Sequence, residues 1–262
     1  MKTPYGTQTT LINQDYNCQL CALGKARAHA NTQLKAGQPL KQCIPGAGPR
    51  DLKTLKLIVI SDYPGHYEEL YGWPQVDINS IKGERKNGVL LPRNSGAFLR
   101  MVISGLLGLD SYKDVWMTNA VKCNPTKTKV IESAHLKPCV RQWLGPELLI
   151  LDQECPKVPL LVAGLQAFRA VKMLYRQHTT QLETLGFNGC RRRNDLTLNG
   201  RPVVFAPNPA RSARSEPRIE STVLFNGGKW VVGENEWLYP PPLGSPVRSF
   251  IEDLKFLAPL LR

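Results

Sequence analysis

The sequence of 262 residues lacks any long hydrophobic run. No segment approaches the roughly 20 consecutive apolar residues of a transmembrane helix, which excludes a membrane span. The first residues, MKTPYGTQTT, also lack the charged start and apolar stretch of a secretory signal peptide. The chain contains no internal repeat and no low-complexity tract. We therefore expect a soluble, cytoplasmic monomer with a proper hydrophobic core and no obligate protein partner.

Acidic residues are scarce relative to basic ones. The 21 Asp and Glu stand against 34 Lys and Arg, which gives a formal net charge of +13 at pH 7. Such a charge favours a polyanionic partner, most commonly nucleic acid. Residues 191–218 hold seven arginines and only two acidic residues. Because guanidinium groups match phosphate oxygens, this segment predicts a DNA-binding surface, with an ordinary solvated basic face as the alternative.

Four short apolar runs predict β-strands at residues 55–61, 115–121, 158–164 and 201–207. Continuous apolar runs are typical of a sheet that is covered on both faces. Helical patterns accompany them at residues 95–108, 133–151, 165–177 and 247–261. The alternation predicts an α/β fold, a three-layer sandwich with a central, mainly parallel four-stranded sheet.

The chain is expected to form a single domain over residues 1–262, with an N-terminal extension of about 50 residues. Residues 72–94 have mixed polarity and no clear period. They form an insertion that is long for a connection between a strand and a helix. Connections of this length are typically functional lids or disordered segments.

Polar residues collect just beyond the ends of the predicted strands. Asp62 and Gly65 follow the first strand, Asn119 lies near the end of the second, and Asn208 follows the fourth. Each alone is a common turn or capping residue. Open α/β sheets bind ligands beyond the carboxyl ends of their strands, so we expect these residues to converge on one pocket.

Seven cysteines, an odd number, favour metal ligation or buried thiols over disulfides in a reducing compartment. Cys18 and Cys21 form a Cys-x-x-Cys pair, and Cys123 and Cys139 would complete a four-thiolate site. Such a site suits zinc or a four-iron cluster, and the spacing alone does not choose between them. The remaining cysteines are expected to be buried thiols: Cys43, Cys155 and Cys190.

Several motifs together resemble those of the iron-sulfur uracil-DNA glycosylases, the family 4 type of the uracil-DNA glycosylase superfamily. TNAVKC matches a family motif without a gap, and the next cysteine falls at the family's spacing. The other similar motifs are CQLCAL (18–23), GAG (46–48) and SDYPG (61–65) with the acidic pair Glu68 and Glu69. The resemblance implies a DNA glycosylase with a structural four-iron four-sulfur cluster, in place of zinc, held by Cys18, Cys21, Cys123 and Cys139.

Other positions depart from the family's pattern. Asn208 stands where the family has a histidine that donates to O2 of the base, and Asp62 replaces a glutamate. Leu91 lies nearest the position of the family's stacking phenylalanine, and Gly65 lies where some uracil-specific relatives have a tyrosine against C5. These departures imply a pocket for a pyrimidine with a substituent at C5.

The resemblance also implies roles for individual residues. Asp62 would stabilise the sugar cation and orient a water molecule, and Asn208 would donate a neutral hydrogen bond to the departing base. Asn119 would bind the Watson-Crick edge, and its amide fits uracil in one orientation and cytosine in the other. Further base contacts are assigned to Tyr63, Gly65 and Leu91, and DNA contacts to Arg211, Ser212 and Arg214.

The expected function is therefore excision of a modified pyrimidine from DNA, which leaves an abasic site. Hydroxymethylated or glucosylated cytosine of bacteriophage DNA is one such base, so the setting is repair or antiviral defence. Two alternatives share the scaffold: a plain uracil-DNA glycosylase, and an inactive protein that binds a lesion or a flipped base. A third is chemistry on a free nucleotide, against which the arginine-rich segment argues.

Overall fold

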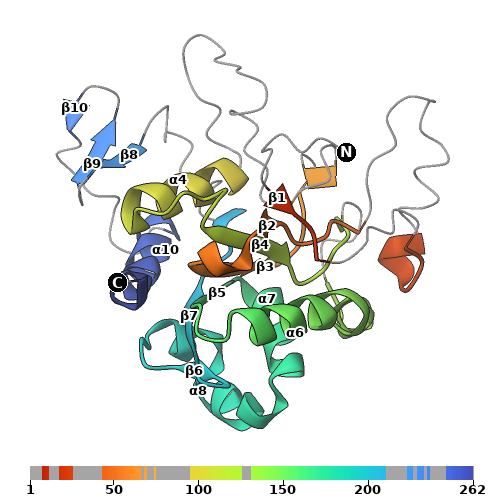
Figure 1. The fold of residues 1–262 in the computed structure, drawn as a ribbon. Helices are drawn as coiled ribbons and strands as arrows, with labels where there is room; N and C mark the ends of the chain where they lie inside the picture. Colours follow the sequence, from red (N-terminus) through yellow and green to blue (C-terminus); the bar gives the residue numbers. More distant parts are fainter. Residues whose placement is uncertain are drawn as a thin grey trace, which may run out of the picture.

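A computed structural model describes residues 8–11, 18–25, 43–65, 68–69, 74, 95–125, 131–210, 223–226, 229–232, 235–236 and 246–261. Within these ranges the central sheet has five strands in the order β4-β3-β5-β7-β6 (Figure 1). The strands are β3 (Leu57–Ser61), β4 (Val115–Asn119), β5 (Leu160–Ala163), β6 (Thr197–Leu198) and β7 (Arg201–Ala206). The first three and β7 are parallel, whereas β6 runs antiparallel to β7.

The predicted four parallel strands are confirmed, but the count of four is wrong because of β6. This strand has only two residues and returns directly into β7 through Asn199 and Gly200, both with positive φ. A run of two residues carries no periodicity, so the sequence pattern does not indicate it. The hairpin adds an antiparallel edge to an otherwise parallel sheet.

The sheet is buried on both faces, as its continuous apolar runs predict. Alternate residues of β3 enter different cores: Ile58 and Ile60 join one cluster, and Leu57 and Val59 join the other. The first core contains α5 (Ser133–Cys139), η2 (Val140–Leu144), α6 (Gly145–Glu154), α7 (Leu165–Leu174) and α8 (Thr179–Arg191). The second contains α4 (Ser95–Leu107), α10 (Pro246–Leu254) and η4 (Lys255–Leu261), and Figure 1 shows these two groups on opposite sides of the sheet. The three-layer prediction is confirmed.

The helix predicted over residues 133–151 is continuous in space but changes its winding. Its middle part, η2, is a π-helix that begins directly after Pro138 and Cys139. Helix α8 has no counterpart among the predicted helices. Its interior contains Gly186 with φ of 62°, which interrupts the helical repeat that a sequence pattern would show.

Short elements complete the described chain. A 3-10 turn, η1 (Leu52–Thr54), precedes β3, and another, η3 (Arg176–His178), follows α7. Near the N-terminus, β1 (Gln8–Thr9) pairs with β2 (Gly48–Pro49). A separate antiparallel sheet contains β8 (Val223–Asn226), β9 (Lys229–Val232) and β10 (Asn235–Glu236).

Candidate active site at the strand ends

Asp62 directly follows β3 and is 7% exposed. Its Oδ1 atom accepts hydrogen bonds from the backbone N–H groups of Gln166, at 2.8 Å, and Ala167, at 3.0 Å. These are the second and third residues of α7, and the residue before the helix, Gly164, has no side chain to cap them. Asp62 therefore caps α7 from another part of the chain, where the helix dipole favours a carboxylate.

Gly164 makes this contact possible. A Cβ atom at this position would lie 2.2 Å from Oδ1 of Asp62, and the backbone φ is 119°. Both the close approach and the conformation favour glycine over every other residue. The strand end of β5 is therefore shaped to let the Asp62 carboxylate reach the helix N-terminus.

Asn208, beyond the end of β7, completes the surroundings of Asp62. Its Nδ2 atom donates to Oδ2 of Asp62 at 2.7 Å, and its Oδ1 accepts from the backbone N–H of Ala210 at 2.8 Å. Burial raises the pKa of Asp62, while the hydrogen bonds from Asn208 and the two α7 amides act in the opposite direction. The predicted convergence of Asp62 and Asn208 across the sheet is confirmed.

Asn119 is the last residue of β4, and its side chain is fully buried. Its Nδ2 atom donates to Oε1 of Glu68 at 3.2 Å, whereas its Oδ1 finds no hydrogen-bond partner among the described residues. The other oxygen of Glu68 accepts from the backbone N–H of Gly65. Glu68 thus connects the loop after β3 with the end of β4, a role that the sequence did not reveal.

The other predicted site residues divide into two groups. Tyr63 is 39% exposed. Among the described residues, a Cβ atom at Gly65 would meet only Oε2 of Glu68 within 4 Å, at 3.4 Å. The remaining predicted site residues lie outside the described residues: Leu91, Arg211, Ser212 and Arg214. Nearly all of the 72–94 insertion also lies outside them.

The family model of the Uracil DNA glycosylase superfamily matches residues 49–225, which contain the described central sheet with Asp62, Asn119 and Asn208. The chain belongs to this superfamily. A search of curated proteins gave no match. Members of the Uracil DNA glycosylase superfamily act on DNA as N-glycosylases, which agrees with a site at the strand ends of an α/β sheet. No helix in the described part of the chain has both the length and the apolar character needed to cross a bilayer.

Within this glycosylase fold, the arginine-rich segment serves the protein's own structure in part. Arg201 is 2% exposed and donates to Asp152 and to two backbone carbonyls. Arg191 pairs with Asp253 at 2.7 Å, and Arg193 pairs with Asp195. For Arg201 and Arg191 the prediction of a phosphate-binding surface is wrong, because their guanidinium groups bind carboxylates within the fold. For Arg193, which is exposed together with Asp195, it stays a prediction.

Lys122, the lysine of the TNAVKC motif, forms a buried ion pair with Glu147 of α6. Lys122 and Glu147 have no exposed side-chain surface, and Lys122 Nζ lies 2.6 Å from Oε2 of Glu147. Thr118 donates to the same oxygen at 3.0 Å, and Trp116 Nε1 donates to the other at 2.6 Å. A Cβ atom at Gly46 would lie 1.5 Å from Glu147, which explains the first glycine of GAG. The sequence signal that could have revealed this pair is the position of Glu147, which shares the buried face of α6 with Leu148 and Leu151.

The four cysteines assigned to a cluster gather from three chain segments. Cys123 and Cys43 lie close enough to Cys18 to lower the pKa of its thiol, and burial, with smaller contributions from Cys21 and Cys18, raises the pKa of Cys139. Among the residues described, no three His, Cys, Asp or Glu side chains form a ligand set for a single metal ion. Four thiols are a ligand set that suits structural zinc as well as a four-iron cluster. The predicted buried thiols are confirmed: Cys43, Cys155 and Cys190.

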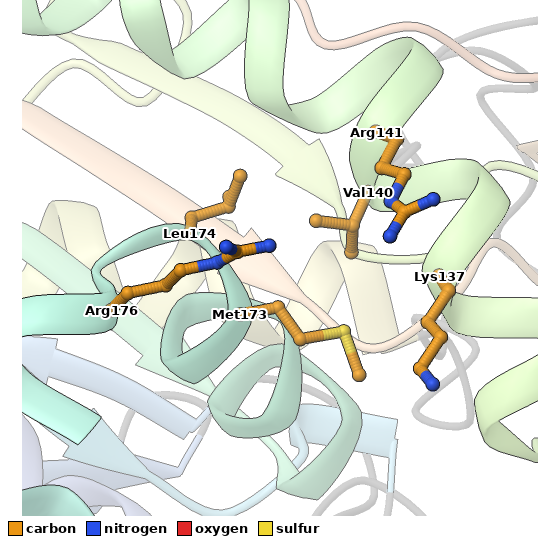
Figure 2. A pocket seen from close by; sticks show the side chains of 6 residues that line it. All are labelled: Lys137, Val140, Arg141, Met173, Leu174 and Arg176. Carbon is orange, nitrogen blue, oxygen red and sulfur yellow. The ribbon is translucent and has the colours of Figure 1, made fainter. Parts of the chain in front are cut away.

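A cavity of about 260 Å³ lies between α5, η2 and the end of α7, away from the residues of the candidate site. Figure 2 shows its lining of three basic and three apolar side chains: Lys137, Arg141, Arg176, Val140, Met173 and Leu174. The described residues that line it include no carboxylate, side-chain amide or thiol. The strand ends therefore remain the candidate active site.

Proposed function

We propose that the protein is a DNA glycosylase that flips out and excises a C5-modified pyrimidine, such as hydroxymethylated or glucosylated cytosine. The observation that carries the proposal is the Asp62–Asn208 pair, which stands at the carboxyl edge of the sheet with Asn119 at the same edge. A base must leave the stack before a glycosylase can act on it. The edge supplies groups for both fragments of the broken N-glycosidic bond.

Asp62 acts on the sugar. As the bond breaks, positive charge develops on the ring, and an ionised carboxylate beside it stabilises that charge and orients the attacking water. The α7 amides and Asn208 hold the carboxylate in one position before the substrate arrives. Such preorganisation avoids a reorganisation cost during the reaction.

Asn208 and Gly65 act on the base. Nδ2 of Asn208 carries two hydrogens, and among the described residues only Asp62 accepts one of them, so the second could be donated to O2 of the departing base. Gly65 has no side chain, and the space around its Cα contains few neighbours within the described residues. This space supports a substituent at C5 of the pyrimidine.

The proposal is tested with duplexes that contain uracil, hydroxymethyluracil, hydroxymethylcytosine or glucosylated hydroxymethylcytosine at one position. After incubation, alkali cleaves the strand at every abasic site. We expect cleavage with the modified bases and little with uracil, and no cleavage when Asp62→Asn protein is used. Uracil cleaved as fast as the modified bases would instead identify a plain uracil glycosylase.

One observation favours a second candidate, a binding protein without chemistry. Both carboxylate oxygens of Asp62 already have donors within the protein, as they would in a purely structural helix cap. This candidate predicts binding to modified duplexes with no abasic product. It also predicts that a folded Asp62→Asn variant binds DNA as well as the wild type does.

We further propose that Cys18, Cys21, Cys123 and Cys139 hold a four-iron four-sulfur cluster of the family 4 type. The cluster would supply a covalent link between the N-terminal segment and the loop after β4. The nearness of Cys18 to Cys123, and of Cys139 to Cys18 and Cys21, supports a shared site. The resemblance of TNAVKC and the cysteine spacing to the iron-sulfur family favours a cluster over zinc. Anaerobically purified protein should show sulfur-to-iron absorbance and bound iron, both lost in Cys123→Ser. Stoichiometric zinc without iron would contradict the assignment.

A further inference from the structure

Two neighbouring carboxylates hold residues 118–125, TNAVKCNP, at two points, one at the end of β4 and one in the loop that follows. Glu68 accepts from Asn119 at 3.2 Å, and Glu69 accepts from Asn124 at 2.8 Å. Both glutamates are nearly fully buried, at 5% and 1% exposed. The acidic pair that follows SDYPG therefore binds two asparagines five residues apart. Asn119 ends β4, and Asn124 lies in the loop after it.

The contact with Glu68 determines how the amide of Asn119 is turned. An ionised carboxylate only accepts hydrogen bonds, so the nitrogen of the amide must face Glu68. Glu68 itself is held by the backbone N–H of Gly65 on its other oxygen. The carbonyl oxygen of Asn119 is thereby left without a partner among the described residues, although its side chain is fully buried. Buried acceptors of this kind are rare and costly, which suggests that a ligand completes them.

Resting on the proposed function, we propose that Glu68 is the positioning residue that sets base specificity by fixing the amide of Asn119. A free amide fits both pyrimidine edges. Uracil-type bases present N–H at N3 and an acceptor at position 4, whereas cytosine-type bases present an acceptor at N3 and an amine at position 4. A fixed amide can present only Oδ1, the atom without a partner among the described residues, as an acceptor to the base. It therefore fits one of these two edges better than the other.

Glu68→Gln tests this role with almost no change in size. The glutamine oxygen keeps the hydrogen bond from Gly65, and its amine then faces Asn119. The favourable partner of that amine is Oδ1, so the amide of Asn119 turns over and presents Nδ2 to the base. We expect the preference between hydroxymethyluracil and hydroxymethylcytosine to fall by roughly tenfold or more, since a mismatched buried polar group is costly.

Glu69→Gln is the matched control, because Glu69 is adjacent and equally buried but contacts Asn124. Its preference should stay within about twofold of the wild type. The double variant Glu68→Gln with Asn119→Asp provides a rescue. A carboxylate at position 119 has only oxygens, so it accepts from the glutamine amine and again presents an acceptor to the base. The preference should return toward that of the wild type.

The measurement is the ratio of single-turnover excision rates on duplexes that differ only in the two bases. If the wild type excises neither, the proposed function has failed, and the same ratio is taken from binding affinities on duplexes with non-cleavable 2′-fluorinated sugars. The inference stands if Glu68→Gln lowers the ratio and Glu69→Gln does not. It is overturned if the wild type has no preference, if both variants shift the ratio equally, or if neither does.

Should Glu68→Gln fail to fold, the double variant decides: a folded protein without the wild-type preference overturns the inference.

Discussion

Asn119 ends β4 and Asn208 lies just beyond the end of β7 in the same sheet, yet their side-chain amides differ in how many hydrogen-bond partners they have. Asn208 is half-buried, and both ends of its amide have protein partners, Asp62 and Ala210. Asn119 is fully buried, and one end of its amide has none among the described residues. Asp62 and Asn208 therefore form a finished part of the site, which is ready before the substrate arrives. Asn119 belongs to an unfinished part, which a ligand would complete.

The finished part depends on one carboxylate. Asp62 to Ala removes the group that would stabilise the sugar cation, and excision should fall by about 10²–10⁴-fold. It also uncaps α7, which should lower the free energy of unfolding by about 0.5–2 kcal/mol. Single-turnover excision and urea denaturation measure the two effects.

Asp195→Ala is the control for this change, because Asp195 is an exposed aspartate that pairs only with Arg193 among the described residues. It should alter neither the excision rate nor the stability. If Asp62→Ala loses stability but has the same product yield as the wild type, Asp62 is a structural cap only.

Three residues after Asn119, Lys122 forms the buried ion pair with Glu147. Lys122→Met leaves Glu147 as an uncompensated buried charge, and the free energy of unfolding should fall by about 3–5 kcal/mol. Denaturant unfolding measures this loss. A second change, Glu147→Leu, removes the stranded carboxylate and should recover much of the stability. A double variant as unstable as the single one would show that the pair is not what holds this strand end.

The close approach at Gly164 belongs to the finished part, because its backbone lies against the Asp62 carboxylate. Gly164→Ala places a Cβ atom where the Asp62 carboxylate now lies and forces a non-glycine residue to φ of 119°. The backbone conformation should cost about 1–3 kcal/mol in stability, and displaced Asp62 should lower excision. Gly108→Ala is the comparison, since it also has positive φ but has open space around its Cα. Equal losses of excision in the two variants would mean that strain alone, and not the carboxylate, is responsible.

The sequence predicts the parts of this molecule that follow from continuous patterns. The four buried strands and the placing of Asp62, Asn119 and Asn208 at their ends were predicted from apolar runs and the known edge of α/β sheets. The partners of Asn119 and Lys122 were not predicted. Glu68 and Glu147 lie 51 and 25 residues away along the chain, and no local pattern indicates which buried acid meets which polar group. Gly46 lies against Glu147, but a glycine in the sequence does not show which acid approaches it.

The smallest expected effect concerns the acidity of Asp62. In the proposed mechanism Asp62 acts in its ionised form, so excision should rise with pH through the pKa of Asp62, which burial raises above the usual value for aspartate. The hydrogen bond from Asn208 lowers the pKa of Asp62 and so partly offsets burial. Asn208→Ala removes this donor, and the pKa of Asp62 should rise further. The acidic limb of the pH-rate profile should therefore move to higher pH, and the maximal rate should also fall because a donor to the departing base is lost. An unmoved acidic limb would mean that the finished part of the site is held by α7 alone, and that Asn208 acts on the base without tuning the carboxylate.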